Sequence, residues 1–352
     1  MDPQKLTKVS LRNFTAFSKL DIEFSSGINI FVGANGTGKT HILKLLYALC
    51  DVTRTGANLG EKLVRVFLPN RLRIGRLTHR ARLKRQQVNH VKTLVKVYRG
   101  KDRKICLSFS SQTTEASSLR PEGVSGWIDD RIECAYIPSK EMLSHAPGFR
   151  SLYASREVYF DETYADIVDR AYLPVSRAVM ETKQDKRSEL LKMLRKAMGG
   201  RVTTKGEEFF LRNNMGVLEF TLLAEGFRKL ALLWLLVQNG TLQTGSLLFW
   251  DEPEANLNPK IMGTVVDALL ELQRMGVQVF LATHNYVILK EFDLRQKEGD
   301  QVKYHALFYD SATGEVVLHS TADYSSIHPN AIADTFMGLY NRDVERALGE
   351  ED

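Results

Sequence analysis

The sequence has no run of about 18 apolar residues, the length that a helix needs to cross a bilayer, which argues against a membrane-spanning protein. Its opening, MDPQKLTKVS, lacks the apolar stretch of a secretory signal, so we expect a cytoplasmic protein. Only three cysteines occur among 352 residues, far apart at Cys50, Cys106 and Cys134. They fit a reducing compartment without disulfides, and together with the eight histidines they form no zinc-type spacing.

The charge of the chain is unevenly placed. The net charge is +6, yet Lys62 to Lys104 holds fifteen Lys or Arg and one acid, so the remainder carries −8. Two interpretations stay open: a solvated face, or a surface that binds the phosphate backbone of non-specific DNA by releasing counterions. The residues predicted for such a surface are Arg76, Arg80, Arg82, Lys84 and Arg85.

Hydrophobic periodicity predicts an α/β chain. Short alternating runs before residue 33 indicate two or three strands, and residues 91–109 indicate a hairpin that turns at Gly100-Lys101-Asp102. Mainly helical sequence follows from about 155 to 199, and residues 201–223 indicate a strand pair. Beyond residue 224, buried strands alternate with helices, which predicts a mostly parallel core sheet.

A phosphate-binding loop stands between the strand and the helix of INIFVGANGTGKTHILKLLYALC. Its residues fit the pattern G-x-x-x-x-G-K-[ST]: Gly33, Ala34, Asn35, Gly36, Thr37, Gly38, Lys39 and Thr40. The backbone N–H groups of such a loop close around phosphates at the positive end of the helix. We expect Lys39 to reach the β- and γ-phosphates of a nucleotide and the Thr40 hydroxyl to hold Mg²⁺.

Two later strands end in polar residues at what should be the same edge of the sheet. LLFWDEP carries Asp251, a predicted Mg²⁺ ligand, and Glu252, a predicted general base for the attacking water. FLATHN carries Thr283 and His284, and the histidine is interpreted as a γ-phosphate sensor. The alternatives are an acid pair that caps a strand and a structural histidine.

The order of phosphate loop, DEP strand and histidine resembles the ABC-type ATPases, in the branch that includes SMC, RecF and OLD-family proteins. The resemblance covers nearly the whole chain and implies ATP and Mg²⁺ as cofactors, with Lys39, Glu252 and His284 catalytic. It implies one two-lobed ATPase domain over 1–352, with an antiparallel β subdomain and a helical subdomain. Lobe I, with the phosphate loop and the basic insert, would span 1–150, the helical subdomain 151–215, and the signature helix, Walker B strand, switch histidine and C-terminal segment 216–352.

Further positions follow from the resemblance. LRNFTAFSKLDIEF looks like the opening of the RecF and OLD proteins, which places Arg12 and Asn13 near the nucleotide. ANLNP stands where the family has its D-loop, so Asn258 would face a partner subunit. AYIPSKEML is similar to the segment with IPP-K-E in small prokaryotic members of the branch.

Two features depart from the family. The Ser-Gly-Gly signature appears as AEGFRK from Ala224, in which Glu225 and Gly226 would face a partner's γ-phosphate and Arg228 or Lys229 would add charge. The alternative is the start of a buried helix. No convincing Q-loop glutamine is found. Together these departures predict slow hydrolysis or ATP-gated assembly.

No second activity is found in the chain. The residues after His284 contain no D-x-D pair, which the TOPRIM nuclease of OLD-type proteins needs. We therefore expect an ATPase that forms a homodimer through its ATP sites, or a higher oligomer. Its expected role is the ATPase or sensor subunit of a prokaryotic antiphage defence system with a separately encoded nuclease or toxin effector. The alternatives are a RecF-like repair and recombination ATPase and, less in keeping with the departures, a transporter's nucleotide-binding subunit.

Overall fold

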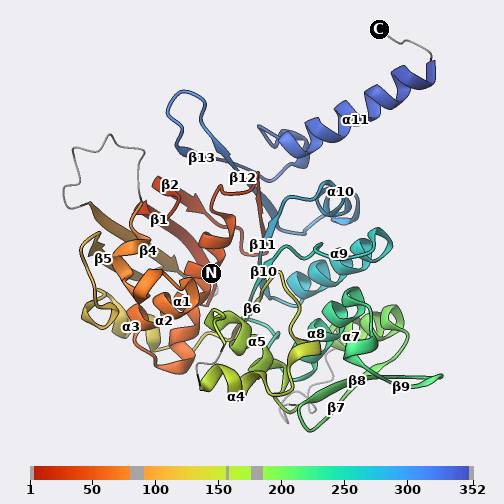
Figure 1. Ribbon diagram of the computed structural model, residues 1–352. Coiled ribbons are helices and arrows are strands. Elements are labelled where there is room, and N and C mark those ends of the chain that lie inside the picture. Colours follow the sequence, from red (N-terminus) through yellow and green to blue (C-terminus); the bar gives the residue numbers. More distant parts are fainter. Residues whose placement is uncertain (1–3, 80–90, 156–157, 176–184, 349–352) are drawn as a thin grey trace.

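The core of the protein is a six-stranded sheet in the order β13-β12-β3-β11-β10-β6 (Figure 1). The computed structural model describes residues 4–79, 91–155, 158–175 and 185–348. All neighbouring strands in this sheet are parallel except β12 and β13. The strands are β3 Ile28–Val32, β6 Cys134–Ile137, β10 Leu247–Asp251, β11 Gln278–Thr283, β12 Val302–Tyr309 and β13 Val316–Thr321. The α/β class with a mostly parallel core sheet is thus confirmed.

Helices cover both faces of this sheet, which explains why its central strands are continuous apolar runs. Every residue of β3, β10 and β11 is buried. Helix α1, Lys39–Thr55, packs with one face of the sheet in one hydrophobic cluster. Helices α8, Glu225–Gln238, and α9, Pro259–Arg274, pack with the other face in a second cluster. Helix α10, Tyr286–Arg295, follows β11.

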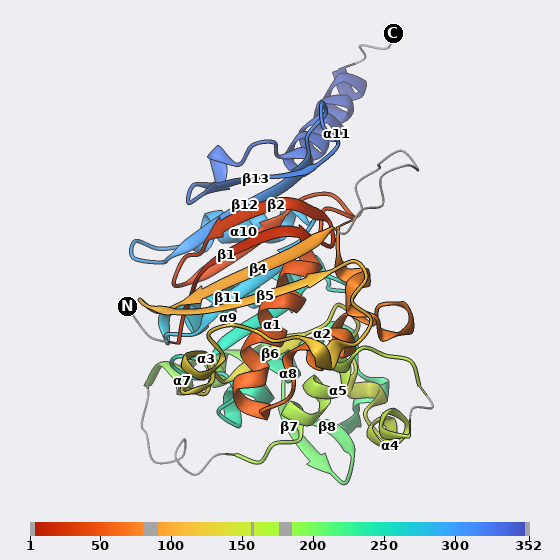
Figure 2. The same ribbon diagram turned by 90° about the vertical axis from the view of Figure 1, so that its left-hand side faces the viewer.

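A four-stranded antiparallel sheet lies over α1 in the order β2-β1-β4-β5 (Figure 2). Its strands are β1 Leu6–Phe14, β2 Phe17–Glu23, β4 Lys92–Arg99 and β5 Arg103–Ser110. The predicted hairpin over 91–109 is confirmed, with Gly100 at φ 57° in its turn. Two helices adjoin this region, α2 Leu59–Phe67 and α3 Val124–Ile128.

A mainly helical region carries a small third sheet. Its helices are α4 Phe149–Ala154, α5 Glu162–Ala171 and α7 Asp185–Met198, and its strands are β7 Arg201–Lys205, β8 Glu208–Asn213 and β9 Gly216–Glu219. The sequence predicted a strand pair here, and β9 adds a third strand. Helix α11, Ala331–Leu348, extends away from the body (Figures 1 and 2). Over the described ranges, no helix combines the length and apolar character needed to cross a membrane.

Candidate functional site

The phosphate loop joins β3 to α1 in a conformation that requires glycine at two positions. Gly33 has φ 151°, and a Cβ atom there would lie 2.2 Å from the carbonyl oxygen of Leu307. Gly38 has φ 91°, and its Cβ would lie 2.5 Å from Cζ of Phe17. Because neither position can hold a side chain, the sequence pattern and the packing around the loop agree.

The side chain of Lys39 folds back over this loop. Its Nζ donates hydrogen bonds to the carbonyl oxygens of Gly33, at 2.6 Å, and Ala34, at 2.9 Å. Burial lowers the pKa of Lys39, while the nearby carboxylates of Glu252 and Asp251 act in the opposite direction. The ammonium group therefore lies at the mouth of the loop, where a phosphate group would meet it.

Thr40 and Asp251 are brought together from positions 211 residues apart. The Thr40 hydroxyl lies 3.0 Å from both carboxylate oxygens of Asp251, and the Tyr136 hydroxyl donates to one of them at 3.5 Å. Asp251 is 8% exposed, and burial raises its pKa to about 6. A hydroxyl beside a buried carboxylate is a set of oxygen ligands that fits Mg²⁺, whose charge would compensate the buried carboxylate.

Glu252 and His284 meet at the carboxyl ends of β10 and β11. Nδ1 of His284 lies 3.4 Å from Oε1 of Glu252. Glu252 has φ 49°, a left-handed backbone that is uncommon for this residue type, and its N–H donates to the Ala282 carbonyl at 2.9 Å. A backbone conformation of this kind costs free energy, so it persists only where the surrounding structure holds it in place. Such residues cluster at functional sites.

Glu254 is a site residue that our sequence analysis missed. This buried carboxylate accepts hydrogen bonds from the Thr283 hydroxyl at 2.6 Å and from the His284 N–H at 3.2 Å, so it fixes the backbone that carries the histidine. Burial raises its pKa. The only signal in the sequence was an acid two positions after Glu252, which does not reveal a contact across thirty residues.

A cavity of about 970 Å³ lies beside the phosphate loop. It is lined by Gly36 and His41, by the β1–β2 turn with Thr15 and Ala16, by parts of the stretch 67–79, and by the β12–β13 hairpin from Tyr309. The Tyr309 hydroxyl donates to the Gly36 carbonyl at 3.0 Å. The volume of the cavity is that of a small-molecule site, roughly 300–1,000 Å³, and the position of the cavity next to the phosphate loop suits a nucleoside.

Arg12 and Asn13 do not line this cavity. The Arg12 guanidinium pairs with Asp21 at 2.8 Å, and the Asn13 amide donates to the carbonyl of Lys92 at 3.0 Å. Thr15 and Ala16, in the turn that follows them, line the cavity. Arg76, predicted as part of a nucleic-acid surface, is among the lining residues.

The signature-like segment forms the start of α8, beside the loop that stands in the D-loop position. The Asn256 amide donates to the Glu225 carboxylate at 2.9 Å, and Gly226 packs so closely that a Cβ would lie 3.1 Å from Leu257. Asn258 is exposed and caps α9 by accepting from the N–H of Lys260 at 3.0 Å.

The two cations of the signature-like segment do not behave as expected. Nζ of Lys229 is buried and donates to the Ala255 carbonyl, and burial lowers its pKa. Arg228 forms an ion pair with Glu141, with 2.6 Å between Nε and Oε2. The expectation that either side chain adds charge toward a partner is therefore not met, because both are held within the subunit.

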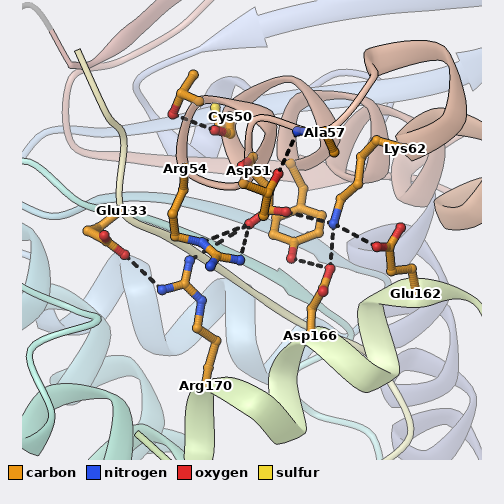
Figure 3. A network of polar contacts seen from close by, with 12 residues as sticks. Cys50, Asp51, Arg54, Ala57, Lys62, Glu133, Glu162, Asp166 and Arg170 are labelled. Atoms are coloured by element: carbon orange, nitrogen blue, oxygen red, sulfur yellow. Dashed lines mark hydrogen bonds and ion pairs between the residues drawn. The ribbon is translucent and has the colours of Figure 1, made fainter. Parts of the chain in front are cut away.

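The basic stretch Lys62–Lys104 is not one continuous surface. Lys62 is buried, with its ammonium 2.7 Å from both Asp51 and Asp166 (Figure 3). Arg99 is buried and donates to backbone carbonyls, including that of Asp130. Several of the cations thus serve the fold. The predicted surface residues Arg80, Arg82, Lys84 and Arg85 lie outside the described residues.

A different basic surface appears between α7 and β8. It is a second cavity, of about 570 Å³, whose lining contains no acid. We call it the basic cradle, and its cations are Lys192, Arg195, Lys196, Arg201 and Arg212. Arg201 and Arg212 stand directly opposite each other on β7 and β8, an arrangement of like charges that destabilises a sheet. The cradle is not visible in the sequence because its members come from separate elements.

Comparisons with known proteins identify the family of the chain. The family model described as "AAA domain, putative AbiEii toxin, Type IV TA system" matches residues 67–290. The DNA replication and repair protein RecF of Streptococcus suis is 27% identical over 154 residues, which are 44% of this chain and 38% of RecF. RecF of Natranaerobius thermophilus is 25% identical over 187 residues, 52% of this chain and 45% of RecF. The chain thus spans less than half the length of these relatives.

Solved structures show the same fold. A head domain of Smc, bound to the C-terminal winged-helix domain of ScpA, matches with a TM-score of 0.56 at 16% identity, over 90% of this chain and 97% of that one. The Smc head domain from Pyrococcus furiosus with an extended coiled coil, bound to the C-terminal domain of ScpA, matches at 0.54 and 13%, over 96% and 98%. The chain belongs to the family of AAA domains described as putative AbiEii toxins of type IV toxin–antitoxin systems, and it is an ABC-type ATPase of the SMC/RecF branch.

Proposed function

We propose that the protein binds and slowly hydrolyses ATP and that ATP joins two copies of it into a homodimer. The observation that carries this proposal is the convergence of Thr40, Asp251, Glu252 and His284 at one edge of the sheet, next to the phosphate loop. Fold and family alone would leave the activity open, because function depends on the residues of the site.

The residues at this edge of the sheet have separate roles in phosphoryl transfer. Lys39 exchanges its carbonyl partners for the β- and γ-phosphates, and Glu252 accepts a proton from the attacking water. His284, next to Glu252, contacts the γ-phosphate. Thr40 and Asp251 would hold Mg²⁺, which neutralises charge on the phosphates when it is bound. A second copy completes the site through the exposed D-loop asparagine and the start of α8.

The proposed biological role is that of ATPase or sensor subunit in a cytoplasmic antiphage defence system, beside a separate nuclease or toxin effector. The description of its family, which names a toxin–antitoxin system, supports this role. Partners that are encoded beside the gene and co-purify with the protein test it. A nuclease or toxin would support the role, whereas recombination factors would favour a RecF-like repair ATPase.

The ATPase proposal predicts opposite results for two variants. Lys39→Ala should abolish binding of a fluorescent ATP analogue, since no other side chain of the loop carries a charge. Glu252→Gln should keep binding, lower turnover by about 10²-fold or more and accumulate an ATP-bound dimer, because the base is removed while the phosphate contacts remain. Light scattering after gel filtration measures the mass. A Glu252→Gln protein that binds ATP and stays monomeric would contradict the two-copy site.

A second ligand is favoured by the basic cradle. Five cations in a concave site without an acid form the electrostatic pattern that binds the phosphate backbone of nucleic acid. The exposed Met215, at the β8–β9 turn beside the cradle, adds an apolar side chain of the kind that contacts bases. We therefore propose non-specific DNA as a ligand of this region, in place of the stretch Lys62–Lys104.

A further inference from the structure

The segment AYIPSKEML connects two parts of the proposed ATP site. Its first residues belong to β6, which pairs in parallel with β10, so that Ile137 stands opposite Trp250, directly before Asp251. Tyr136 reaches Asp251 through its hydroxyl. Past Pro138 the chain leaves the sheet as a loop that leads to Glu141.

Glu141 has a buried side chain, and both of its carboxylate oxygens have partners. Its side chain is 1% exposed and accepts hydrogen bonds from the N–H of Leu143, the N–H of Ser144 at 3.3 Å and the Ser144 hydroxyl at 2.9 Å. Its remaining partner is Arg228 in the first turns of α8, with 2.6 Å between Oε2 and Nε. The Glu141 carboxylate therefore stabilises its own loop and also holds the Arg228 guanidinium.

Arg228 also holds the chain that leads into α8. Its Nη1 donates to the carbonyl oxygens of Phe220 and Leu223, both at 2.9 Å. On its other side, the start of α8 is attached to the loop after Asp251, through Lys229 to the Ala255 carbonyl. The first turns of α8 are therefore fixed between two segments, each of which continues from a strand at the edge that carries Asp251.

We propose that Glu141 is a positioning residue that couples the nucleotide-binding edge to the signature-like helix α8. In this role the Glu141–Arg228 pair replaces the Q-loop glutamine, for which the sequence offers no equivalent. The inference rests on the proposed function, because it assumes that ATP binds at Thr40 and Asp251. A shift of Asp251 reaches β6 through Tyr136, continues along the loop to Glu141, and moves the start of α8 through Arg228.

The test measures how ATP changes hydrogen exchange of amides 220–230, with and without the pair. In the unmodified chain, ATP should slow exchange in this stretch. Glu141→Gln keeps the size of the side chain and removes its charge, so ATP should still bind, with a Kd within about threefold, while the ATP-induced protection falls about fivefold or more. Arg228→Met should give the same loss, and the double variant should lose no more than either single one, because the two residues act as a unit.

A matched control removes another ion pair with one enclosed carboxylate. Asp300 is 4% exposed and pairs with Arg274 at 2.5 Å, between α9 and the loop before β12. Asp300→Asn should lower the thermal midpoint and leave the ATP-induced protection of 220–230 unchanged. Equal loss of protection in this control would mean that general destabilisation, and not coupling, explains the result.

The outcomes separate the inference from the proposed function. ATP binding with unchanged protection in Glu141→Gln, or with no protection of 220–230 in the unmodified chain, would overturn the coupling inference alone. An unmodified chain that binds no ATP would overturn both. Normal binding with lost protection in both single variants, and no further loss in the double variant, would establish Glu141 as the coupling residue.

Discussion

At the scale of single residues, Asp251 shows what burial of a carboxylate costs. It has no ion-pair partner among the described residues, and burial raises its pKa to about 6 although Thr40 donates to it. The folded state therefore binds a proton more tightly than the unfolded chain, whose aspartate has an ordinary pKa of 3.8. Without metal, the stability linked to Asp251 is fully present below about pH 4 and is lost as the pH rises through about 6.

This sign gives a prediction for Asp251→Asn. At pH 8 without Mg²⁺, the variant should be more stable than the unmodified chain by roughly 1–3 kcal/mol, because it no longer buries a charge. Near pH 4 the difference should vanish. Urea unfolding at both pH values, followed by circular dichroism, measures it. Equal differences at the two pH values would show that the carboxylate is not destabilised in the folded state.

Residues of this site differ in how well the sequence predicts them. Lys39 and Thr40 belong to a motif whose spacing is local, so the sequence identifies them directly. Glu254 and Tyr136 are contacts made across the sheet, and their roles depend on which strands become neighbours. Strand order in a parallel sheet is not encoded by periodicity, which reports only which faces are buried.

At the scale of elements, polar contacts join α1 and α2 to α5, and Figure 3 shows those around Asp51, Lys62 and Asp166. The Lys44 ammonium lies 2.7 Å from Asp161, and the Tyr47 hydroxyl donates to Asp166 at 2.6 Å. Lys62 of α2 bridges Asp166 to Asp51 of α1, at 2.7 Å from each. The helix that begins at the phosphate loop is thus joined to the helical region by buried and partly buried ion pairs, in which the loss of one partner leaves the other charge uncompensated.

Among the residues of this interface, Lys62 is the one whose substitution should lower the free energy of unfolding most. Lys62→Met leaves Asp51 buried without its ammonium partner and should lower the free energy of unfolding by about 3–5 kcal/mol at pH 7. Adding Asp51→Asn should recover part of the loss. Urea titrations of the single and double variants measure both effects. A loss below about 1 kcal/mol in Lys62→Met, the value of an exposed pair, would contradict the importance of burial.

The pH dependence of the same interface follows from its acid. The Lys62 ammonium and the Arg54 guanidinium lower the pKa of Asp51 against the effect of burial. This contribution to stability is therefore present above the pKa of the unfolded aspartate, near 4, and is lost as the pH falls below it. In Lys62→Met, acidification should cost less stability than in the unmodified chain, which unfolding curves between about pH 3 and 6 would show.

Elements themselves were largely predictable, because a strand, a helix or a tight turn depends on neighbouring residues. The hairpin at Gly100 and the long helix from Glu225 are examples. Strand β9 was missed because its residues are mostly exposed and give no alternation. The burial of Lys62 and Arg99 was not predicted for a related reason: charge counts do not show which side chains point into the protein.

At the scale of the whole molecule, the position of the positive charge decides where DNA would bind. We predict that the basic cradle, rather than residues 80–85, carries the interaction. Charge reversal in the cradle by K192E, R195E, K196E and R212E should weaken duplex binding and lower the magnitude of the slope of log affinity against log salt by about 3.6. The matched variant R80E, R82E, K84E and R85E has the same change in net charge and should bind DNA within about threefold of the unmodified chain, because it leaves the cradle's phosphate contacts in place.

Fluorescence anisotropy with a duplex of mixed sequence measures the DNA affinity of both variants, and unchanged ATP affinity serves as the control for folding. Loss of DNA binding in the second variant alone would return the DNA surface to residues 80–85.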